Sequence, residues 1–251
     1  MFDEYRNKMD GQIALITGGS QGIGKAAATA FAMAGASVAI AANNPEQTEE
    51  AAAEINAMGG KAIGIYCEVT DYQSVKQAVE KCVQAFGGLD LLYANAGVVL
   101  QREMVEDSNV DKWKKTIEIN LFGVYHAARA AIPHLKARGG GRIITTGSGR
   151  GRRSAVNISD YACSKAACWM LVRELAIELL PYNILVNEFI PGPVISDLNR
   201  DLGDKQDPVF SHDQEVVKPP KDCVPMLMYI ATQPLANGAS GQTFSMNRRE
   251  I

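Results

Sequence analysis

Short apolar segments alternate with longer amphipathic segments along nearly the whole sequence. The apolar segments are rich in β-branched residues and predict strands at 13–17, 37–41, 62–66, 89–94, 142–146, 184–189 and 242–245. The segments between them have helical spacing and predict helices at 23–34, 46–58, 72–86, 110–136, 161–180 and 221–232. This alternation predicts an α/β fold, with a doubly wound, parallel, seven-stranded sheet that helices cover on both faces.

The chain is predicted to form one domain over residues 1–251. Its 251 residues, 47% of them hydrophobic, suit a single sizeable core, and no linker or internal repeat divides them. One irregular stretch, 196–220, is polar, rich in Asp, Gly and Pro, and too long for a simple connection. We interpret it as a substrate lid.

Charge and hydropathy exclude several classes of partner. The net charge of −3 gives no electrostatic reason to bind nucleic acid or an anionic membrane surface. No apolar run approaches the ~18 residues of a membrane span, and the charged first ten residues lack the apolar centre of a signal peptide. These features predict a soluble cytoplasmic protein.

The cysteines predict neither disulfides nor a metal site. They are odd in number, they form no Cys-x2-Cys pair, and no histidine is spaced to complete a metal site. We therefore expect no bound metal and buried, reduced thiols at Cys67, Cys82, Cys163, Cys168 and Cys223.

A glycine-rich turn follows the first predicted strand and opens directly into the first helix. Its spacing is Gly-x3-Gly-x-Gly, from Gly18 to Gly24. Backbone amides in such a turn, together with the positive end of the helix, can bind a pyrophosphate, although glycines there can also be purely structural. We predict dinucleotide binding by Gly18, Ser20, Gln21, Gly22, Ile23 and Gly24.

A candidate reaction site lies at the end of the fifth predicted strand, where Ser148 follows the apolar segment 142–146. Ligands of open α/β sheets collect at the carboxyl ends of strands. Tyr161 and Lys165 stand four residues apart on one helix face, so an ammonium lies within one turn of a phenol. The ammonium favours the phenolate, which suits the tyrosine to proton transfer. Alone, such a pair is more often an ordinary solvated helix face.

Several motifs in the right order give the sequence a clear resemblance to the short-chain dehydrogenase/reductase family. Residues 17–24 resemble its cofactor turn, and 93–97 its Asn-Asn-Ala-Gly segment, with Tyr93 replacing the first asparagine. Ser148 matches the catalytic serine, thirteen residues before Tyr161. Residues 191–196 resemble the segment at the nicotinamide end of the cofactor, with Ser196 replacing the usual threonine. The resemblance covers nearly the whole chain and implies a Rossmann fold.

The resemblance implies an oxidoreductase that interconverts a secondary alcohol and a ketone or aldehyde by hydride transfer. Tyr161 would exchange the proton, Ser148 would hold the substrate oxygen, and Lys165 would bond the nicotinamide ribose. Asn120 would hold a water that links Lys165 to solvent. Without the other motifs, Asn120 would be interpreted as a polar residue whose side chain hydrogen-bonds backbone groups of the helix. The implied cofactor contacts also include Tyr161 and Lys165 themselves, together with Glu68, Val69, Asn95, Ala96, Gly97, Pro191, Gly192, Val194 and Ser196.

The residue after the second strand bears on the choice of cofactor. NAD enzymes commonly carry a carboxylate there for the ribose 2′-hydroxyl, but this chain has Ala42. Its absence favours NADP. Because no arginine or lysine follows at 43–44, NAD stays open. Asn43 is predicted to touch the ribose or its phosphate.

The substrate is predicted to be a small polar molecule, because the lid has few large apolar side chains. Arg152 and Arg153 lie beside the expected pocket, and with His212 of the lid they form a candidate site for an anionic substrate. They could equally lie at the surface or in a subunit contact.

Two further expectations concern activity and assembly. The alternative to an enzyme is a catalytically idle dinucleotide-binding sensor or scaffold, which the complete catalytic set disfavours. The family often assembles through the helices predicted at 110–136 and 161–180, so the resemblance implies a homotetramer or a homodimer.

Overall fold

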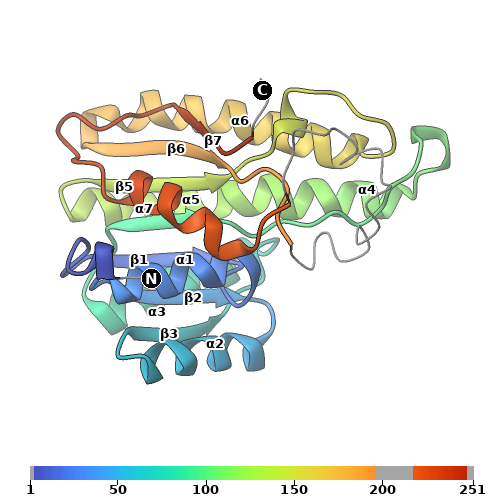
Figure 1. The fold of residues 1–251 in the computed structure, drawn as a ribbon. Coiled ribbons are helices and arrows are strands. Elements are labelled where there is room, and N and C mark those ends of the chain that lie inside the picture. Colours follow the sequence, from blue (N-terminus) through green and yellow to red (C-terminus); the bar gives the residue numbers. More distant parts are fainter. Residues whose placement is uncertain (1–2, 196–216, 248–251) are drawn as a thin grey trace.

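A seven-stranded parallel sheet forms the centre of the protein. In the computed structural model, residues 3–195 and 217–247 are described (Figure 1). The strand order is β3-β2-β1-β4-β5-β6-β7, and every neighbouring pair is parallel. The strands are β1 (Ile13–Thr17), β2 (Ser37–Ala42), β3 (Lys61–Tyr66), β4 (Leu91–Ala94), β5 (Gly141–Thr146), β6 (Ile184–Ile190) and β7 (Thr243–Ser245). The predicted fold class is confirmed.

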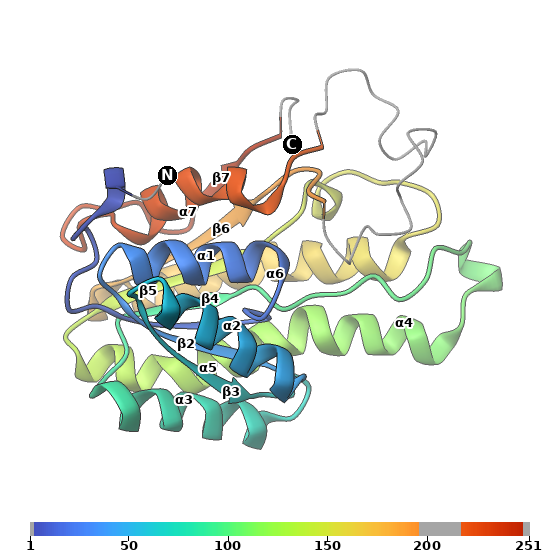
Figure 2. The same cartoon turned by 60° about the horizontal axis from the view of Figure 1, so that its bottom comes forward.

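Helices cover both faces of this sheet and enclose one apolar core on each side (Figures 1 and 2). One face carries α1 (Gly22–Met33), α2 (Pro45–Ala57) and α7 (Val224–Ala231). The other carries α3 (Tyr72–Phe86), α5 (Gly123–Ala137) and α6 (Ser159–Leu179). Because both faces are buried, β1 consists entirely of buried residues, which explains its continuous apolar run.

The strand order reverses between β1 and β4, because the chain returns from β3 across β1 to continue on its other side. At such a reversal the connections leave the two strands in opposite directions. The carboxyl ends of these strands then frame a crevice in which ligands bind. The turn after β1 and the segment after β4 therefore lie side by side at the place where the sequence predicts cofactor binding.

The helix predicted over 110–136 is interrupted. The structure has α4 (Val110–Ile117), then a π-helical turn (Glu118–Phe122), then α5. A π turn carries an extra residue, which a search for 3.6-residue periodicity does not reveal, and such turns occur often at functional sites. Asn120 lies in the middle of it.

Smaller differences have local causes. The strand predicted from residue 89 begins at Leu91, because the Asp90 carboxylate accepts a hydrogen bond from the Ile13 amide at 2.9 Å. The last predicted helix begins as a 3-10 helix (Pro220–Cys223) before α7. Four cysteines are buried as expected, but Cys163 is exposed on α6, so that part of the prediction is wrong.

Most of the predicted lid, 196–216, lies outside the described residues, and with it lie Ser196 and His212. The last part of this segment is described: Lys218 forms a parallel bridge with Val194, and its ammonium donates to the Pro191 carbonyl at 2.7 Å. In the described ranges no helix is long and apolar enough to cross a membrane. Those ranges also contain no group of three or more His, Cys, Asp or Glu side chains that could hold a metal ion.

Candidate active site

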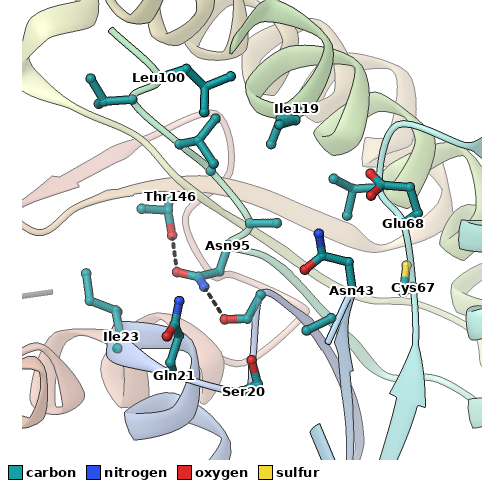
Figure 3. Close-up of a pocket in the computed structure, with 18 of the residues that line it drawn as sticks. Ser20, Gln21, Ile23, Asn43, Cys67, Glu68, Asn95, Leu100, Ile119 and Thr146 are labelled. Carbon is teal, nitrogen blue, oxygen red and sulfur yellow. Dashed lines mark hydrogen bonds between the residues drawn. The ribbon is translucent and has the colours of Figure 1, made fainter. Parts of the chain in front are cut away.

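A pocket of about 540 Å³ opens at the carboxyl ends of β1, β2, β4 and β5 (Figure 3). It brings together segments far apart in the sequence, from the glycine turn to α6. Its walls include most of the predicted cofactor residues, namely Gly18, Ser20, Gln21, Gly22, Ile23, Asn43, Glu68, Val69, Asn95, Ala96, Gly97, Tyr161 and Lys165.

The glycine turn is held close to the segment that follows β4. Gly18 has a φ of 62°, in the left-handed region that favours glycine. A Cβ atom at Gly24 would overlap the Gly18 carbonyl oxygen and lie 2.6 Å from the Asn95 amide nitrogen. Asn95 donates to the Gly18 carbonyl at 3.0 Å and accepts from the Thr146 hydroxyl at 3.0 Å (Figure 3). Asn95 thereby joins the turn after β1 to the end of β5.

The start of α1 fits the pyrophosphate of a dinucleotide. Gln21, the residue at the N-cap, is extended and makes no side-chain cap, so no capping side chain occupies the first amides of the helix. Gln21, Gly22 and Ile23 line the pocket, so the positive end of α1 lies at its wall. The backbone is thus arranged to receive an anionic group there.

The part of the pocket wall around Glu68 carries a connected polar network. Glu68 accepts from the Thr70 amide at 3.0 Å and from its hydroxyl at 2.8 Å, and Lys115 donates to that hydroxyl at 3.3 Å. Burial opposes ionisation of Glu68, but the Thr70 bonds, the Lys115 charge and a bond from Asn43 outweigh it and lower its pKa. Glu68 is therefore an ionised carboxylate at neutral pH. Ala42 completes this end of the wall.

Tyr161 and Lys165 meet at the pocket from the first turns of α6. Lys165 is almost fully buried, at 3% exposure, and its ammonium donates to the Thr146 carbonyl at 2.8 Å. The same nitrogen lies 5.7 Å from the centroid of the Tyr161 ring. The structure thus places a buried ammonium beside a phenol at the wall of the pocket that the glycine turn also lines.

Asn120 is fully buried behind this wall. Its side chain accepts from the Val98 amide at 2.7 Å and donates to the Val98 carbonyl at 2.9 Å and to the Ser164 hydroxyl at 3.1 Å. Its backbone carbonyl accepts from the Cys168 thiol at 3.0 Å. The side chain therefore fixes the segment after β4 against α6 and does not line the pocket.

Some predicted residues lie beside the pocket without lining it. Ser148 comes two residues after Thr146, and Thr146 lines the pocket. The Ser148 hydroxyl accepts a hydrogen bond from the Arg150 amide at 3.2 Å. The predicted cofactor residues that are described but do not line this pocket are Gly24, Pro191, Gly192 and Val194.

Arg152 turns away from the pocket. Its guanidinium donates to the Glu188 carboxylate and to the Thr243 hydroxyl, both at 2.6 Å. This commitment argues against Arg152 as a side chain that binds a substrate anion. Arg153 forms no ion pair with another described residue.

Sequence reasoning missed several residues of the wall. Thr146 ends the strand before Ser148, and its position at a strand end was a usable signal. Lys115 gave none, because only the fold brings α4 to the end of the pocket near Glu68. Further wall residues not predicted are Gln47, Cys67, Val98, Val99, Leu100 and Ile119.

Known proteins resemble this chain over most of its length. The family model for short chain dehydrogenase matches residues 12–207. The chain is 34% identical to the 7alpha-hydroxysteroid dehydrogenase of Escherichia coli K12 over 197 residues, which cover 78% of this chain and 76% of that protein. It is 33% identical to the (-)-trans-carveol dehydrogenase of Rhodococcus erythropolis over 221 residues, covering 83% and 79%.

Solved structures extend the likeness to nearly the full chain. A short-chain type dehydrogenase/reductase from Mycobacterium marinum superposes with a TM-score of 0.89 at 32% identity, covering 98% of this chain and 96% of that one. A 7 alpha-hydroxysteroid dehydrogenase complexed with NADH and 7-oxo glycochenodeoxycholic acid gives 0.88 at 30% identity, covering 98% and 97%. The chain therefore belongs to the short-chain dehydrogenase/reductase family and is an NAD(P)-dependent oxidoreductase.

Proposed function

We propose that this enzyme interconverts a small secondary alcohol and its ketone, with Tyr161, Ser148, Lys165 and Asn120 as its catalytic set. The observation that carries the proposal is one shared pocket, lined both by the glycine turn and by Tyr161 and Lys165. A dinucleotide with its pyrophosphate at the turn would place its reactive end toward the phenol.

The nicotinamide supplies or accepts the hydride, and the protein supplies orientation and proton transfer. In the reducing direction, Tyr161 gives its phenolic proton to the carbonyl oxygen of the substrate, and the Ser148 hydroxyl donates to the same oxygen. Lys165 has three N–H donors, of which the Thr146 carbonyl takes one. The other two serve the ribose of the cofactor and the Tyr161 oxygen.

Asn120 has two parts in this proposal. Its side chain holds the Val98 segment in place, and its backbone carbonyl, in the π turn, is the proposed anchor for the water that reconnects Lys165 with solvent. Gly97 keeps this region open, because a Cβ atom there would lie 3.2 Å from the Asn120 side-chain oxygen and 3.5 Å from the Lys165 ammonium.

We propose NADP as the preferred cofactor, with NAD as the alternative. Ala42 offers no carboxylate that would repel a 2′-phosphate, and Asn43 beside it is neutral. Lys115 adds a positive charge at this end of the pocket. The ionised Glu68 opposes this preference and suits the alternative.

The wall beyond Gly97 is apolar, which favours a substrate with a compact carbon skeleton. Val98, Val99 and Leu100 line it in succession. Relatives named for carveol and cyclohexanol support a cyclic secondary alcohol. Because Arg152 is committed to Glu188, an anionic substrate would depend on Arg153.

We also propose a cytoplasmic homotetramer or homodimer. The large exposed apolar side chains Tyr125 on α5 and Met170 and Ile177 on α6 suit an interface formed by these two helices. The absence of disulfides among the five cysteines suits a reducing compartment. Sedimentation that shows a monomer at micromolar concentration would contradict the proposed oligomer.

Initial rates with a panel of cyclic secondary alcohols and their ketones test the proposed reaction. Each compound is assayed with NADP and NAD in the matching redox state. We expect turnover of at least one pair, with higher kcat/KM for NADP. Tight cofactor binding without turnover of any compound would instead favour a sensor.

A further inference from the structure

The loop 147–152 follows β5 and carries Ser148; we call it the catalytic loop. It contains a short 3-10 helix (Gly149–Gly151) and is anchored to β6 by a bond from the Gly147 amide to the Phe189 carbonyl at 2.8 Å. Neither Arg152 nor any other residue of the loop lines the cofactor pocket. Its position therefore depends on the elements packed around it.

Two glycines let those elements approach closely. A Cβ atom at Gly147 would overlap the Glu188 carboxylate, and one at Gly151 would lie 2.8 Å from the backbone carbonyl carbon of Lys165. The loop is therefore confined between a side chain of β6 and the backbone of the helix that carries the catalytic lysine. Ser148 lies between these two glycines, so a shift of Glu188 or of α6 would act on the segment that carries it.

A buried ion pair closes this arrangement. The Arg152 guanidinium donates to one Glu188 oxygen at 2.6 Å, and the Thr243 hydroxyl, on β7, donates to the same oxygen at 2.8 Å. Glu188 is 1% exposed and Arg152 17%. In the described part of the chain, Arg152 is the only cation within ion-pair distance of Glu188. A carboxylate so deeply buried needs such a partner.

Arg152 also contacts the helix that carries the other catalytic residues. Its guanidinium carbon lies 5.2 Å from the ring centroid of Trp169, which is one turn beyond Lys165 on α6. Arg173 stacks on the same ring at 4.0 Å but has no ion pair with Glu188. Arg152 thus connects the catalytic loop, β6, β7 and α6 through one side chain.

We infer that Arg152 and Glu188 form a buried clamp that positions Ser148 against Tyr161 and Lys165. The inference rests on the proposed function, because it concerns the geometry of that catalytic set. Both are positioning residues, since neither lines the pocket. The sequence alone places Arg152 among candidates for anion binding, and the clamp gives it a different task.

Four variants test the clamp: Arg152→Met, Arg152→Lys, the double variant Arg152→Met/Glu188→Met, and Arg173→Met as a matched control. Arg152→Met leaves the Glu188 charge buried and unpaired, so we expect a lower Tm together with a kcat lowered by about a hundredfold, as for a small misplacement of a catalytic group. Cofactor Kd should not change. Arg173→Met should keep kcat, because it removes a Trp169 contact and leaves the clamp intact.

The double variant separates positioning from stability. It removes both charges with similar volume, so Tm should recover while kcat stays low, and Arg152→Lys should restore part of kcat. Recovery of both quantities in the double variant would overturn the clamp and leave a purely structural ion pair. An unchanged kcat with a raised KM in Arg152→Met would overturn it in favour of substrate binding.

Hydrogen exchange of the cofactor-free protein provides a readout that does not depend on turnover. The amides of Gly147, Gly151 and Arg152 are hydrogen-bonded in the described structure, and Arg152→Met should speed their exchange while β1 stays protected. Unchanged exchange in the loop would overturn the clamp. If the wild type turns over no alcohol, the proposed function fails, whereas the exchange result still decides whether the Arg152–Glu188 pair holds the loop in place.

Discussion

The cofactor turn after β1 and the catalytic loop after β5 are both glycine-rich and both leave buried strands at the same edge of the sheet, yet their glycines serve opposite purposes. In the first, Gly18 and Gly24 let the backbone bend and come close to Asn95, and the turn lines the pocket. In the second, Gly147 and Gly151 leave space that Glu188 and the backbone of α6 occupy. One loop uses glycine to present its backbone, and the other uses it to be packed tightly.

This difference suggests two roles within the proposed site. We propose that the turn after β1 binds the cofactor through backbone amides, in a bend that few substitutions at its glycines would allow, whereas the loop after β5 holds Ser148 in place through its neighbours. Changes in the first loop should therefore alter cofactor affinity, and changes in the second should alter turnover.

The largest expected effect comes from Tyr161→Phe, which touches neither loop. Removal of the phenolic proton should lower kcat by roughly 10²–10⁴-fold, because positioned acid–base groups contribute about that much. Cofactor Kd, measured by fluorescence titration, should stay near the wild-type value. Lys165→Ala is the comparison, since it should harm both quantities. A Tyr161→Phe enzyme that keeps more than about a tenth of the wild-type rate would contradict the role of Tyr161 in proton transfer.

Gly24→Ala should act on binding. The added methyl group would overlap the Gly18 carbonyl and push the turn away from α1, at an overpacking cost of about 1–3 kcal/mol. If that strain falls on the bound state, Kd for the cofactor rises about tenfold to a hundredfold, measurable by calorimetry. The kcat at saturating cofactor should change much less. A lowered kcat with normal Kd would contradict the division between the loops.

Gly147→Ala is the reciprocal variant. Its methyl group would collide with the Glu188 carboxylate, so Tm should fall through the same overpacking, of about 1–3 kcal/mol, and kcat should fall with it. Cofactor Kd should remain unchanged because Gly147 packs against Glu188, which does not line the pocket, whereas Gly24 packs against Gly18, which does. Thermal unfolding and steady-state kinetics measure both effects. A variant with raised cofactor Kd and normal kcat would show that the loop after β5 also acts in cofactor binding, and would contradict the division between the two loops.

Ala42→Asp should have the smallest effect, confined to cofactor choice. A carboxylate at this position would accept the 2′-hydroxyl of NAD and repel the 2′-phosphate of NADP. We expect the ratio of the two kcat/KM values to move toward NAD, and Tyr161-dependent chemistry to stay intact. If the ratio does not move, residue 42 is not at the ribose.

The architecture and the glycine turn after β1 could be predicted because local patterns determine them. Buried parallel strands read as continuous apolar runs, and the turn from Gly18 to Gly24 combines strand, spacing and helix in one stretch. The resemblance to a known family added the roles of Ser148, Tyr161 and Lys165.

Contacts between distant segments could not be predicted in this way. Arg152 looks like a surface or substrate arginine until β6 places Glu188 beside it, 36 residues later in the chain. The π turn around Asn120 keeps the apolar pattern of a continuous helix, and Lys115 meets Thr70 only when α4 packs near the end of β3. These features follow from tertiary packing, which residue spacing does not encode.

A crystal structure of the complex with NADP tests the central claim most directly. The account predicts the pyrophosphate against the amides of the turn from Gly18 to Gly24, the nicotinamide ribose on the Lys165 ammonium, and the nicotinamide beside the Tyr161 hydroxyl. A cofactor bound outside this pocket, or one whose nicotinamide lies out of reach of Tyr161, would contradict it.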